Sequence, residues 1–394
     1  MKPISDELII GDDPRSIVGR RAKSVTVARN DNGFEIRFAG ESIFFRCPAV
    51  NLEETRDFNF ALLALALVSM SRGHAFHLSE PVTRSALSQV RRYARVLQVM
   101  KPNIFYSPVV ICPNVIEDRP PAGTDSIVCL SGGVDSTYAA MVRADAFKYA
   151  MFVRGADYPL SATKILEDLA QRATRISQEL RLTPIIVDSN LKDYLSDYGL
   201  QHTGFLAACL YFTGSKFAGA GWAADDPHWG ELVVYPWGNN AGFAQCLSLA
   251  GRPISHIGGS VSRSEKVAEI ARQHPSLFTN ISVCYKFRET ADNCGRCEKC
   301  MRTRLNLQAI GDEPTRVACE MMLFGNQADL ASYVRKVRIP EDAKRLKRAV
   351  FNYQELSIAL PEGELKKCVD AHLAKLMSAG QFAKERTLLQ RVFG

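Results

Sequence analysis

The chain has 394 residues, with 49 basic and 42 acidic side chains, and 46% of its residues are hydrophobic. This composition excludes wholesale disorder and a low-complexity fibre, and the length is sufficient for two or three domains with a sizeable core. The net charge of +7 permits a nucleic-acid or nucleotide partner but does not require one.

Apolar runs, the first residues and the number of cysteines indicate where in the cell the protein is expected. The longest apolar run, residues 60–68, is about half the length that a membrane-spanning helix needs. The first seven residues lack the charged-then-apolar layout of a signal peptide. Eleven cysteines, an odd number, do not suit a fully paired disulfide framework. We therefore expect a soluble cytoplasmic protein.

The first 120 residues predict an α+β region. Residues 34–38 and 42–46 alternate apolar and polar side chains around a short Ala-Gly turn, which predicts a β-hairpin. Residues 60–70 are rich in Ala and Leu and favour a buried helix over a core strand. A second helix is expected over residues 82–100. Proline and glycine then break the chain near residue 120, where we place a domain boundary.

After residue 121 the sequence alternates between strand and helix patterns. Strands are predicted over residues 126–130, 150–153, 184–187 and 232–235, and helices over 134–142, 161–180, 205–217 and 266–272. This alternation predicts an α/β domain over residues 121–311, built on a doubly wound parallel sheet. Residues 312–394 are expected to form a helical extension. Its basic segment, residues 335–348, favours a solvated helix face over a polyanion contact.

A glycine-rich turn follows the first strand of this domain, with the sequence Ser131-Gly132-Gly133-Val134-Asp135-Ser136. Glycines let backbone N–H groups approach an anion, and the helix that follows adds unpaired donors at its N-terminus. The hydroxyls of Ser131 and Ser136 can donate to the same phosphate. We expect Asp135 to orient the loop or to meet a magnesium ion. The pattern is neither a Walker P-loop nor the dinucleotide fingerprint, and it predicts a different kind of phosphate site.

Four cysteines form the second motif. Cys284 precedes the closely spaced Cys294, Cys297 and Cys300, and Gly295 keeps the backbone clear of the sulfurs. Four thiolates suit a closed, structural zinc site that joins two segments of the chain, the zinc knuckle of residues 284–300. An iron–sulfur cluster is the less favoured reading of the same spacing. The other seven cysteines are dispersed and read as small core residues.

Together these motifs carry a resemblance. The Ser131–Ser136 segment resembles the pyrophosphate loop of the N-type ATP pyrophosphatases, the PP-loop superfamily. A PP-loop followed far downstream by the four cysteines is similar to 7-cyano-7-deazaguanine synthases. The resemblance covers about residues 126–311. It implies an adenine nucleotide alpha hydrolase-like fold, a structural zinc on the four cysteines, and ATP with Mg²⁺ bound by Ser131, Gly132, Gly133, Asp135 and Ser136.

The resemblance also suggests catalytic residues. The segment from Ser262 to Ile270 resembles the Ser/Thr-Lys-x-Glu-Ile segment of that family, which aligns Lys266 with its phosphate-side lysine. Lys266 would neutralise charge on the β- and γ-phosphates as pyrophosphate leaves. The alternative is an exposed helix lysine. We therefore expect Asp135 and Lys266 to be the catalytic residues.

Other candidate contacts rest on weaker signals. Arg154 lies at the end of a predicted parallel strand, where ligands of such sheets bind, and His202 precedes a predicted helix. We expect both to contact nucleotide or substrate; the alternatives are a solvated loop at Arg154 and a structural role for His202. Residues 235–240 are expected to shape the acceptor pocket. The acidic residues at 225–226, with His228, read as a turn rather than a metal site.

The resemblance implies a reaction. ATP would adenylate a carbonyl or carboxylate of a 7-deazapurine-like acceptor, and ammonia or another amine would then displace AMP. We expect a divergent member of this family, because the chain adds a long N-terminal region and a C-terminal extension and differs at residues 152–158. We expect it to act in a defence or modification pathway, with a protein partner at its N-terminal region. Two alternatives stay open: a sulfur-transfer enzyme of the same superfamily, and a catalytically retired nucleotide sensor or scaffold.

Overall fold

The computed structural model describes residues 8–9, 21–49, 55–121, 123–214, 217–233, 237–286 and 290–393. The chain forms two compact units, each assembled from several segments. Unit 1 comprises Met1–Ser131, Val142–Ala224 and Trp237–Ile257, and unit 2 comprises Gly132–Met141, Asp225–Pro236 and Gly258–Gly394. The division of the sequence at residues 121 and 312 stays a prediction, because packing alone does not show which segments fold independently.

Unit 1 is built on one large sheet, in which the described residues supply eleven strands. In sheet order the strands are β1 (Leu8–Ile9), β7 (Val109–Cys112), β5 (Ala75–His77), β2 (Lys23–Asn30), β3 (Gly33–Phe38), β4 (Glu41–Arg46), β11 (Thr183–Ser189), β10 (Tyr149–Arg154), β9 (Ser126–Cys129), β12 (Gly219–Ala223) and β13 (Ile254–Ile257). Six of the ten neighbouring pairs are parallel. The expected α/β class with a mostly parallel sheet is confirmed.

The five strands after residue 121 have a specific order. The chain begins at β9, continues outward through β10 to β11, and then returns to the other side of β9 to form β12 and β13. The direction of winding therefore reverses between β9 and β12, which pair in parallel. In open α/β sheets, ligands bind beyond the carboxyl ends of the strands at such a reversal.

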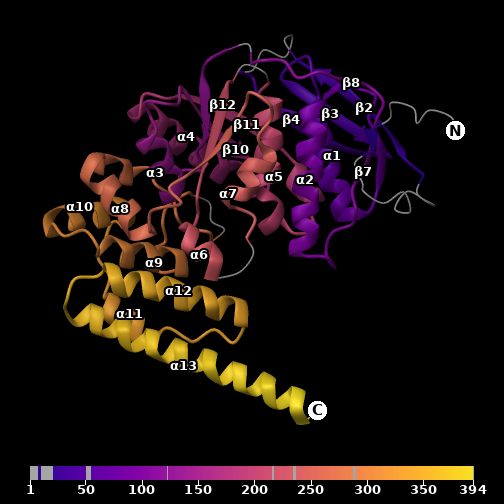
Figure 1. Cartoon of the computed structure of the whole chain (residues 1–394). Coiled ribbons are helices and arrows are strands. Elements are labelled where there is room, and N and C mark those ends of the chain that lie inside the picture. The colour runs from indigo at the N-terminus through magenta and orange to yellow at the C-terminus, as the bar shows by residue number, and fades with distance from the viewer. Residues whose placement is uncertain are drawn as a thin grey trace. The chain divides into compact units, whose positions relative to one another are not determined.

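Helices of unit 1 cover this sheet and share its core. The helix α4 (Thr163–Glu179) packs on β10 and β11, while α1 (Asn59–Arg72), α2 (Arg84–Met100), α5 (Tyr198–Phe212) and α7 (Ala241–Leu247) form a packed group (Figure 1). Residues 59–70 of α1 are all buried, because this helix is apolar on every side. The buried helix expected over residues 60–70 is confirmed.

The hairpin at residues 34–46 is also confirmed, and it extends the sheet. Ala39 and Gly40 both have positive φ, as a tight hairpin turn requires, and β3 pairs antiparallel with β4. The outer strand β4 then pairs with β11. The side-chain amide of Asn190 reinforces this joint by accepting from the Phe44 N–H at 2.9 Å.

Three parts of the secondary-structure prediction are wrong. The strand expected over residues 232–235 is replaced by a helix, α6 (His228–Val233), and residues 234–236 lie outside the described part of the chain. The helix expected over residues 205–217 begins seven residues earlier, at Tyr198. The strands β12 and β13 were not predicted at all.

Close packing explains the unusual composition of β12. Its sequence, Gly-Ala-Gly-Trp-Ala, has no β-branched residue. A Cβ on Gly221 would stand 2.7 Å from the Phe147 ring and 2.8 Å from Ile257. Small residues are needed here because neighbouring side chains occupy the space, and local propensity does not reveal that.

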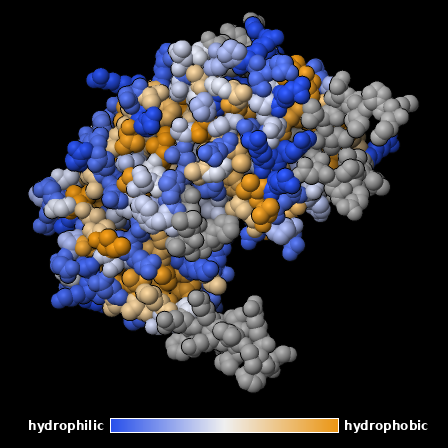
Figure 2. All heavy atoms as spheres, in the orientation of Figure 1, coloured by the Kyte–Doolittle hydropathy of each residue, from blue (hydrophilic) through white to orange (hydrophobic). Residues whose placement is uncertain are grey.

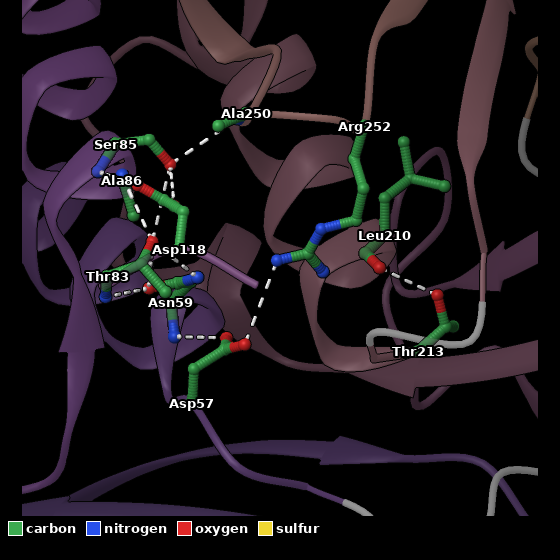
Figure 3. A network of polar contacts seen from close by, with 10 residues as sticks. All are labelled: Asp57, Asn59, Thr83, Ser85, Ala86, Asp118, Leu210, Thr213, Ala250 and Arg252. Carbon is green, nitrogen blue, oxygen red and sulfur yellow. Dashed lines mark hydrogen bonds and ion pairs between the residues drawn. The ribbon is translucent and has the colours of Figure 1, made fainter. Parts of the chain in front are cut away.

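A buried polar network joins the starts of α1 and α2 (Figure 3). The Asn59 amide is fully buried; its oxygen accepts from the Thr83 N–H at 2.9 Å, and its nitrogen donates to the Thr83 hydroxyl at 3.2 Å. Asp57 lies beside it, 3.7 Å from Arg252, and burial raises the pKa of Asp57. The network positions both helices at their first turns.

Replacing Asn59 by alanine should lower the free energy of unfolding by about 2 kcal/mol, because the Thr83 N–H would stay buried without its acceptor. Denaturant titration measures the effect. Asn103→Ala, at an exposed position, is the matched control and should change stability by less than about 0.5 kcal/mol. Equal destabilisation by the two variants would contradict the assigned role.

Unit 2 is predominantly helical in its described residues. Its helices are α3 (Val134–Val142, all but its last residue), α6, α8 (Arg263–Gln273), α9 (Glu298–Leu307), α10 (Glu313–Phe324), α11 (Leu330–Lys336), α12 (Ala343–Ala359) and α13 (Glu364–Phe393). The helices α11, α12 and α13 share a small core with α9 that includes Leu305, Val334, Leu356 and Val369. The helical character expected beyond residue 312 is confirmed.

Surface hydropathy is mixed. Figure 2 shows hydrophilic side chains over most of the face in view, with hydrophobic ones scattered among them. Across the described residues, no helix combines the length and the apolar character needed to cross a membrane.

Candidate functional site

The segments that follow β9, β12 and β13 along the chain all belong to unit 2, and they supply the candidate site. The first is the predicted phosphate loop from Gly132 onward, whereas Ser131 belongs to unit 1. Gly132 has φ +81°, a left-handed conformation that favours glycine, and α3 begins two residues later. The Ser136 hydroxyl donates to the Gly133 carbonyl at 3.2 Å, and Ser131 is exposed. The predicted strand–glycine turn–helix arrangement is therefore present.

Two cations converge on Asp135 in the first turn of α3. The Arg263 guanidinium donates to Oδ2 of Asp135, and Lys266 Nζ lies 3.3 Å from Oδ1. Both cations come from α8, where the spacing of three residues places them on the same face. Ser262 and Glu265 cap this helix reciprocally and so fix where it begins.

Lys266 has no exposed surface. The alternative interpretation, an exposed helix lysine, is therefore wrong. The room for its side chain comes from Gly258, where a Cβ would stand 3.2 Å from Lys266 Cε and 3.1 Å from the Tyr138 ring. The role expected for Lys266 at the phosphates stays a prediction. In this structure its ammonium faces the carboxylate of Asp135.

A second ion pair lies in the same unit. Asp226, in the segment after β12, pairs with Arg348 of α12 at 2.9 Å. Burial is the main cause of a raised pKa at Asp226, against the charges of Arg348 and Arg302. Burial likewise lowers the pKa of Arg302, which is also influenced by Glu298, Arg263 and Arg348. The Asp226–Arg348 ion pair thus ties the loop at residues 225–228 to α12.

Sequence reasoning missed three of these basic residues: Arg263, Arg302 and Arg348. The i,i+3 spacing to Lys266 could have indicated Arg263, and Arg302 follows Cys300 by two positions. No local signal marks Arg348, which is 122 residues from Asp226. The side chain of Arg348 is 23% exposed and ion-paired, so the solvated helix face expected for the basic segment does not include it.

The four predicted cysteine ligands come together. Their sulfur atoms all lie within 4.8 Å of one another, and the pairs Cys284–Cys297 and Cys294–Cys300 are each separated by 3.8 Å. In tetrahedral zinc sites, Zn–S bonds of about 2.3 Å put the sulfurs about 3.8 Å apart. The cluster could therefore hold a metal such as zinc.

Local electrostatics also suit a cation at this cluster. Burial, and then the neighbouring Cys297, raises the pKa of the Cys300 thiol. Burial acts to raise the pKa of the Cys294 thiol, but hydrogen bonds from the backbone N–H groups of Arg296 and Cys297 lower it. The pKa of Cys294 is therefore lowered to about 6. Burial raises the pKa of Cys297, although this residue is the N-cap of α9, where the helix dipole favours thiolates. A metal cation would compensate the remaining cost of four close thiolates.

The cysteine segment is connected to the phosphate loop within unit 2. The Ser282 N–H donates to the Gly132 carbonyl at 2.9 Å. Two residues later, the Cys284 N–H donates to the side-chain oxygen of Asn293 at 3.2 Å, and the Asn293 nitrogen donates to the Leu323 carbonyl at 3.2 Å. A metal that orders the cysteine cluster would therefore also help to hold the backbone at Gly132 in place.

Arg304 holds the backbone of the cysteine segment at Gly295. Its side chain is 1% exposed; it donates to the Gly295 carbonyl at 3.2 Å and forms a buried ion pair with Glu320 of α10. A Cβ on Gly295, whose φ is +68°, would lie 2.7 Å from the Arg304 guanidinium. Glycine at this position therefore satisfies both the backbone and the close approach of Arg304.

Glu320→Ala should destabilise unit 2 by about 3–5 kcal/mol, because it would leave the charge of Arg304 buried without its carboxylate. Thermal and denaturant unfolding measure the loss. Glu313→Ala is the matched control on the same helix: its side chain is 77% exposed, and its removal should cost less than about 0.5 kcal/mol. A near-neutral effect of Glu320→Ala would contradict this account.

The remaining predicted site residues lie in unit 1. Arg154 ends β10 and forms a two-pronged pair with Asp188 of the neighbouring strand, at 2.5 and 2.6 Å. His202 lies within α5, where Nδ1 is 2.9 Å from the Gly199 carbonyl oxygen and the ring packs 5.5 Å from that of Trp237. Nucleotide contact by either residue stays a prediction, as does the acceptor pocket expected at residues 235–240.

Comparison with protein-family models, with curated proteins and with solved structures finds no match to this chain. The class that the fold and the site define is an α/β protein with a four-cysteine cluster that could bind metal.

Proposed function

We propose that the chain is an ATP-dependent adenylating enzyme of the C–N ligase type, which binds the phosphates of ATP at the Gly132–Ser136 loop. The observation that carries the proposal is the arrangement around Asp135. A left-handed glycine turn opens α3, and two cations from α8 converge on the carboxylate in its first turn. Glycine-turn N–H groups, a helix N-terminus and nearby cations are the components of a polyphosphate site.

In the first step, an oxygen of the acceptor's carbonyl or carboxylate attacks the α-phosphorus of ATP. A P–O bond forms, the bond from the α-phosphorus to the α,β-bridging oxygen breaks, and pyrophosphate leaves with that electron pair. Arg263, whose side chain is 21% exposed, meets the charge of the leaving group. Lys266 acts as a positioning residue that holds Asp135, and Asp135 in turn orients Arg263.

In the second step, the lone pair of ammonia or another amine attacks the carbon of the adenylated acceptor. The C–O bond to AMP breaks, AMP leaves, and the nitrogen releases a proton to water. The acceptor is proposed to be a 7-deazapurine-like compound, on the resemblance of the two motifs to 7-cyano-7-deazaguanine synthases. This assignment concerns the acceptor alone, and ATP cleavage can be tested without it.

Mg²⁺ and zinc have different places in this proposal. Both oxygens of Asp135 face cations, so this carboxylate does not fit a Mg²⁺ ligand in the observed arrangement. Mg²⁺ would instead accompany the phosphates of ATP. Zinc fits the four cysteines, whose sulfur spacing matches a closed tetrahedral site, and its role would be structural.

The sulfur-transfer alternative needs a reactive cysteine outside the cluster. Of the seven other cysteines, five are buried and two are partly buried. Burial raises the pKa of Cys129 to about 12 and that of Cys319 to about 11, which disfavours the thiolate that a persulfide carrier needs. These observations favour amine over sulfur transfer.

The test is product analysis of the full-length, zinc-loaded protein with ATP, Mg²⁺, ammonia and candidate deazapurines. Equal amounts of AMP and pyrophosphate, formed only with an acceptor, are the expected result, and mass spectrometry identifies the amidated product. Formation of ADP would contradict the mechanism. ATP binding without turnover under any acceptor would support the retired sensor or scaffold instead.

A further inference from the structure

An open cavity of about 630 Å³ lies at the beginning of α12, in unit 2. Its lining is Asp342, Lys344, Arg345 and Arg348. Asp342 is already engaged as the N-cap of the helix, because its carboxylate accepts the Arg345 N–H at 2.8 Å. Three basic side chains therefore dominate the charge that this cavity presents to a ligand.

The position of these cations is unfavourable for the helix itself. Lys344 and Arg345 lie in the first turn of α12, where the helix dipole favours negative charge and opposes positive charge. Both residues are exposed to solvent. An anionic ligand in the cavity would offset the repulsion between these side chains and the helix N-terminus.

Arg348 connects the cavity to the site around Asp226. One of its guanidinium nitrogens lies 2.9 Å from Asp226, and its charge acts on Arg302. Neither Arg302 nor Arg263 lines the cavity: Arg302 Nε lies 3.7 Å from Glu298 Oε1, and the Arg263 guanidinium pairs with Asp135. The basic groups that a ligand in the cavity would contact are therefore Lys344, Arg345 and Arg348.

We propose that the C-terminal extension forms an anion-binding site for a phosphate-bearing ligand, with Lys344, Arg345 and Arg348 as its principal contacts and Asp226 as the internal counter-ion that the ligand displaces. The site deepens the proposed function and rests on it for the identity of the ligand. The phosphate belongs either to the polyphosphate of ATP or to a phosphorylated acceptor.

The test is isothermal titration of the full-length, zinc-loaded protein with pyrophosphate. Lys344→Ala and Lys347→Ala form a matched pair, since each removes one charge from an exposed position of α12 but only Lys344 lines the cavity. We expect Lys344→Ala to weaken binding about tenfold, as for loss of one charge-assisted contact, and Lys347→Ala to weaken it less than about twofold. Equal effects of the two variants, or no binding by the wild type, would overturn the proposal.

Asp226→Asn provides an independent variant. If the ligand competes with Asp226 for Arg348, removal of that charge should strengthen pyrophosphate binding by about fivefold or more. A merely structural role of the Asp226–Arg348 pair predicts weaker binding or none, and that result would contradict the proposal.

Competition then distinguishes the two sources of phosphate. If saturating non-hydrolysable ATP analogue abolishes pyrophosphate binding, the site belongs to ATP; if pyrophosphate still binds, the site belongs to a phosphorylated acceptor. Either result supports the anion site. A protein that never forms AMP but still separates Lys344→Ala from Lys347→Ala would refute the proposed function and leave this site standing.

Discussion

Cys300→Ser should abolish metal binding and unfold much of unit 2. Cys300 has no exposed surface, and its sulfur lies 3.8 Å from that of Cys294 in the four-sulfur cluster. Structural zinc contributes roughly 10–16 kcal/mol of binding free energy in small zinc domains, and that binding energy is folding energy. We expect metal content to fall from about one zinc per chain to nearly none. Elemental analysis and circular dichroism measure the two effects.

Cys319→Ser is the matched control. Cys319 is also fully buried in unit 2 but lies outside the cluster, on α10. This variant should keep its metal and lose only about 1–2 kcal/mol of stability. Full metal content in Cys300→Ser, or a wild-type protein that binds no metal, would contradict the zinc assignment. Visible absorption from an iron–sulfur cluster would replace zinc with the less favoured alternative.

Removal of the metal should also weaken the binding of ATP. The Ser282 N–H holds the Gly132 carbonyl, and the same segment continues into Cys284. A chelator should therefore weaken ATP binding in parallel with loss of zinc, and restored zinc should recover both. ATP affinity that is unchanged after complete zinc removal would separate the two sites.

Asp135→Ala should reduce AMP formation by about a thousandfold, because the loop would lose the group that orients Arg263. It should also destabilise unit 2 by about 3–5 kcal/mol, since a fully buried Lys266 would lose its carboxylate partner. The single variant therefore confounds activity with folding, and a second variant is needed.

Asp135→Ala combined with Lys266→Met separates the two effects. Removal of both charges should restore most of the stability, because the double variant contains no buried ammonium that lacks a carboxylate partner. Activity should stay low, because Arg263 is still not oriented. Single-turnover AMP formation and denaturant titration give the two readouts. Recovery of activity together with stability would show that Asp135 matters only for folding.

Local motifs made parts of the site predictable from sequence. The turn at Gly132–Gly133 and the helix after it were predictable because glycine conformation and helix initiation depend on neighbouring residues. The cysteine cluster was predictable because three of its ligands lie within seven residues of one another. Lys266 was found by resemblance, although its complete burial was not.

Other parts were not predictable because they depend on distant segments. The strand β12 has poor strand propensity, and its small residues are explained only by Phe147 and Ile257 beside Gly221. Residues 232–233, which were expected to begin a strand, lie in α6 instead, where Gly230 packs closely on the Phe351 ring and Trp229 donates to Glu355. Tertiary contacts outweigh weak local propensities in both places.

Composition and neighbouring residues are enough to establish the mildly basic charge, the alternation of strands and helices, the glycine turn and the four-cysteine spacing. The pairing of Arg263 and Lys266 with Asp135, the pairing of Arg348 with Asp226, and the complete burial of Lys266 depend on the tertiary structure. These contacts join segments that the sequence separates by up to 131 residues, and their pairing depends on the strand order and helix packing that bring the segments together.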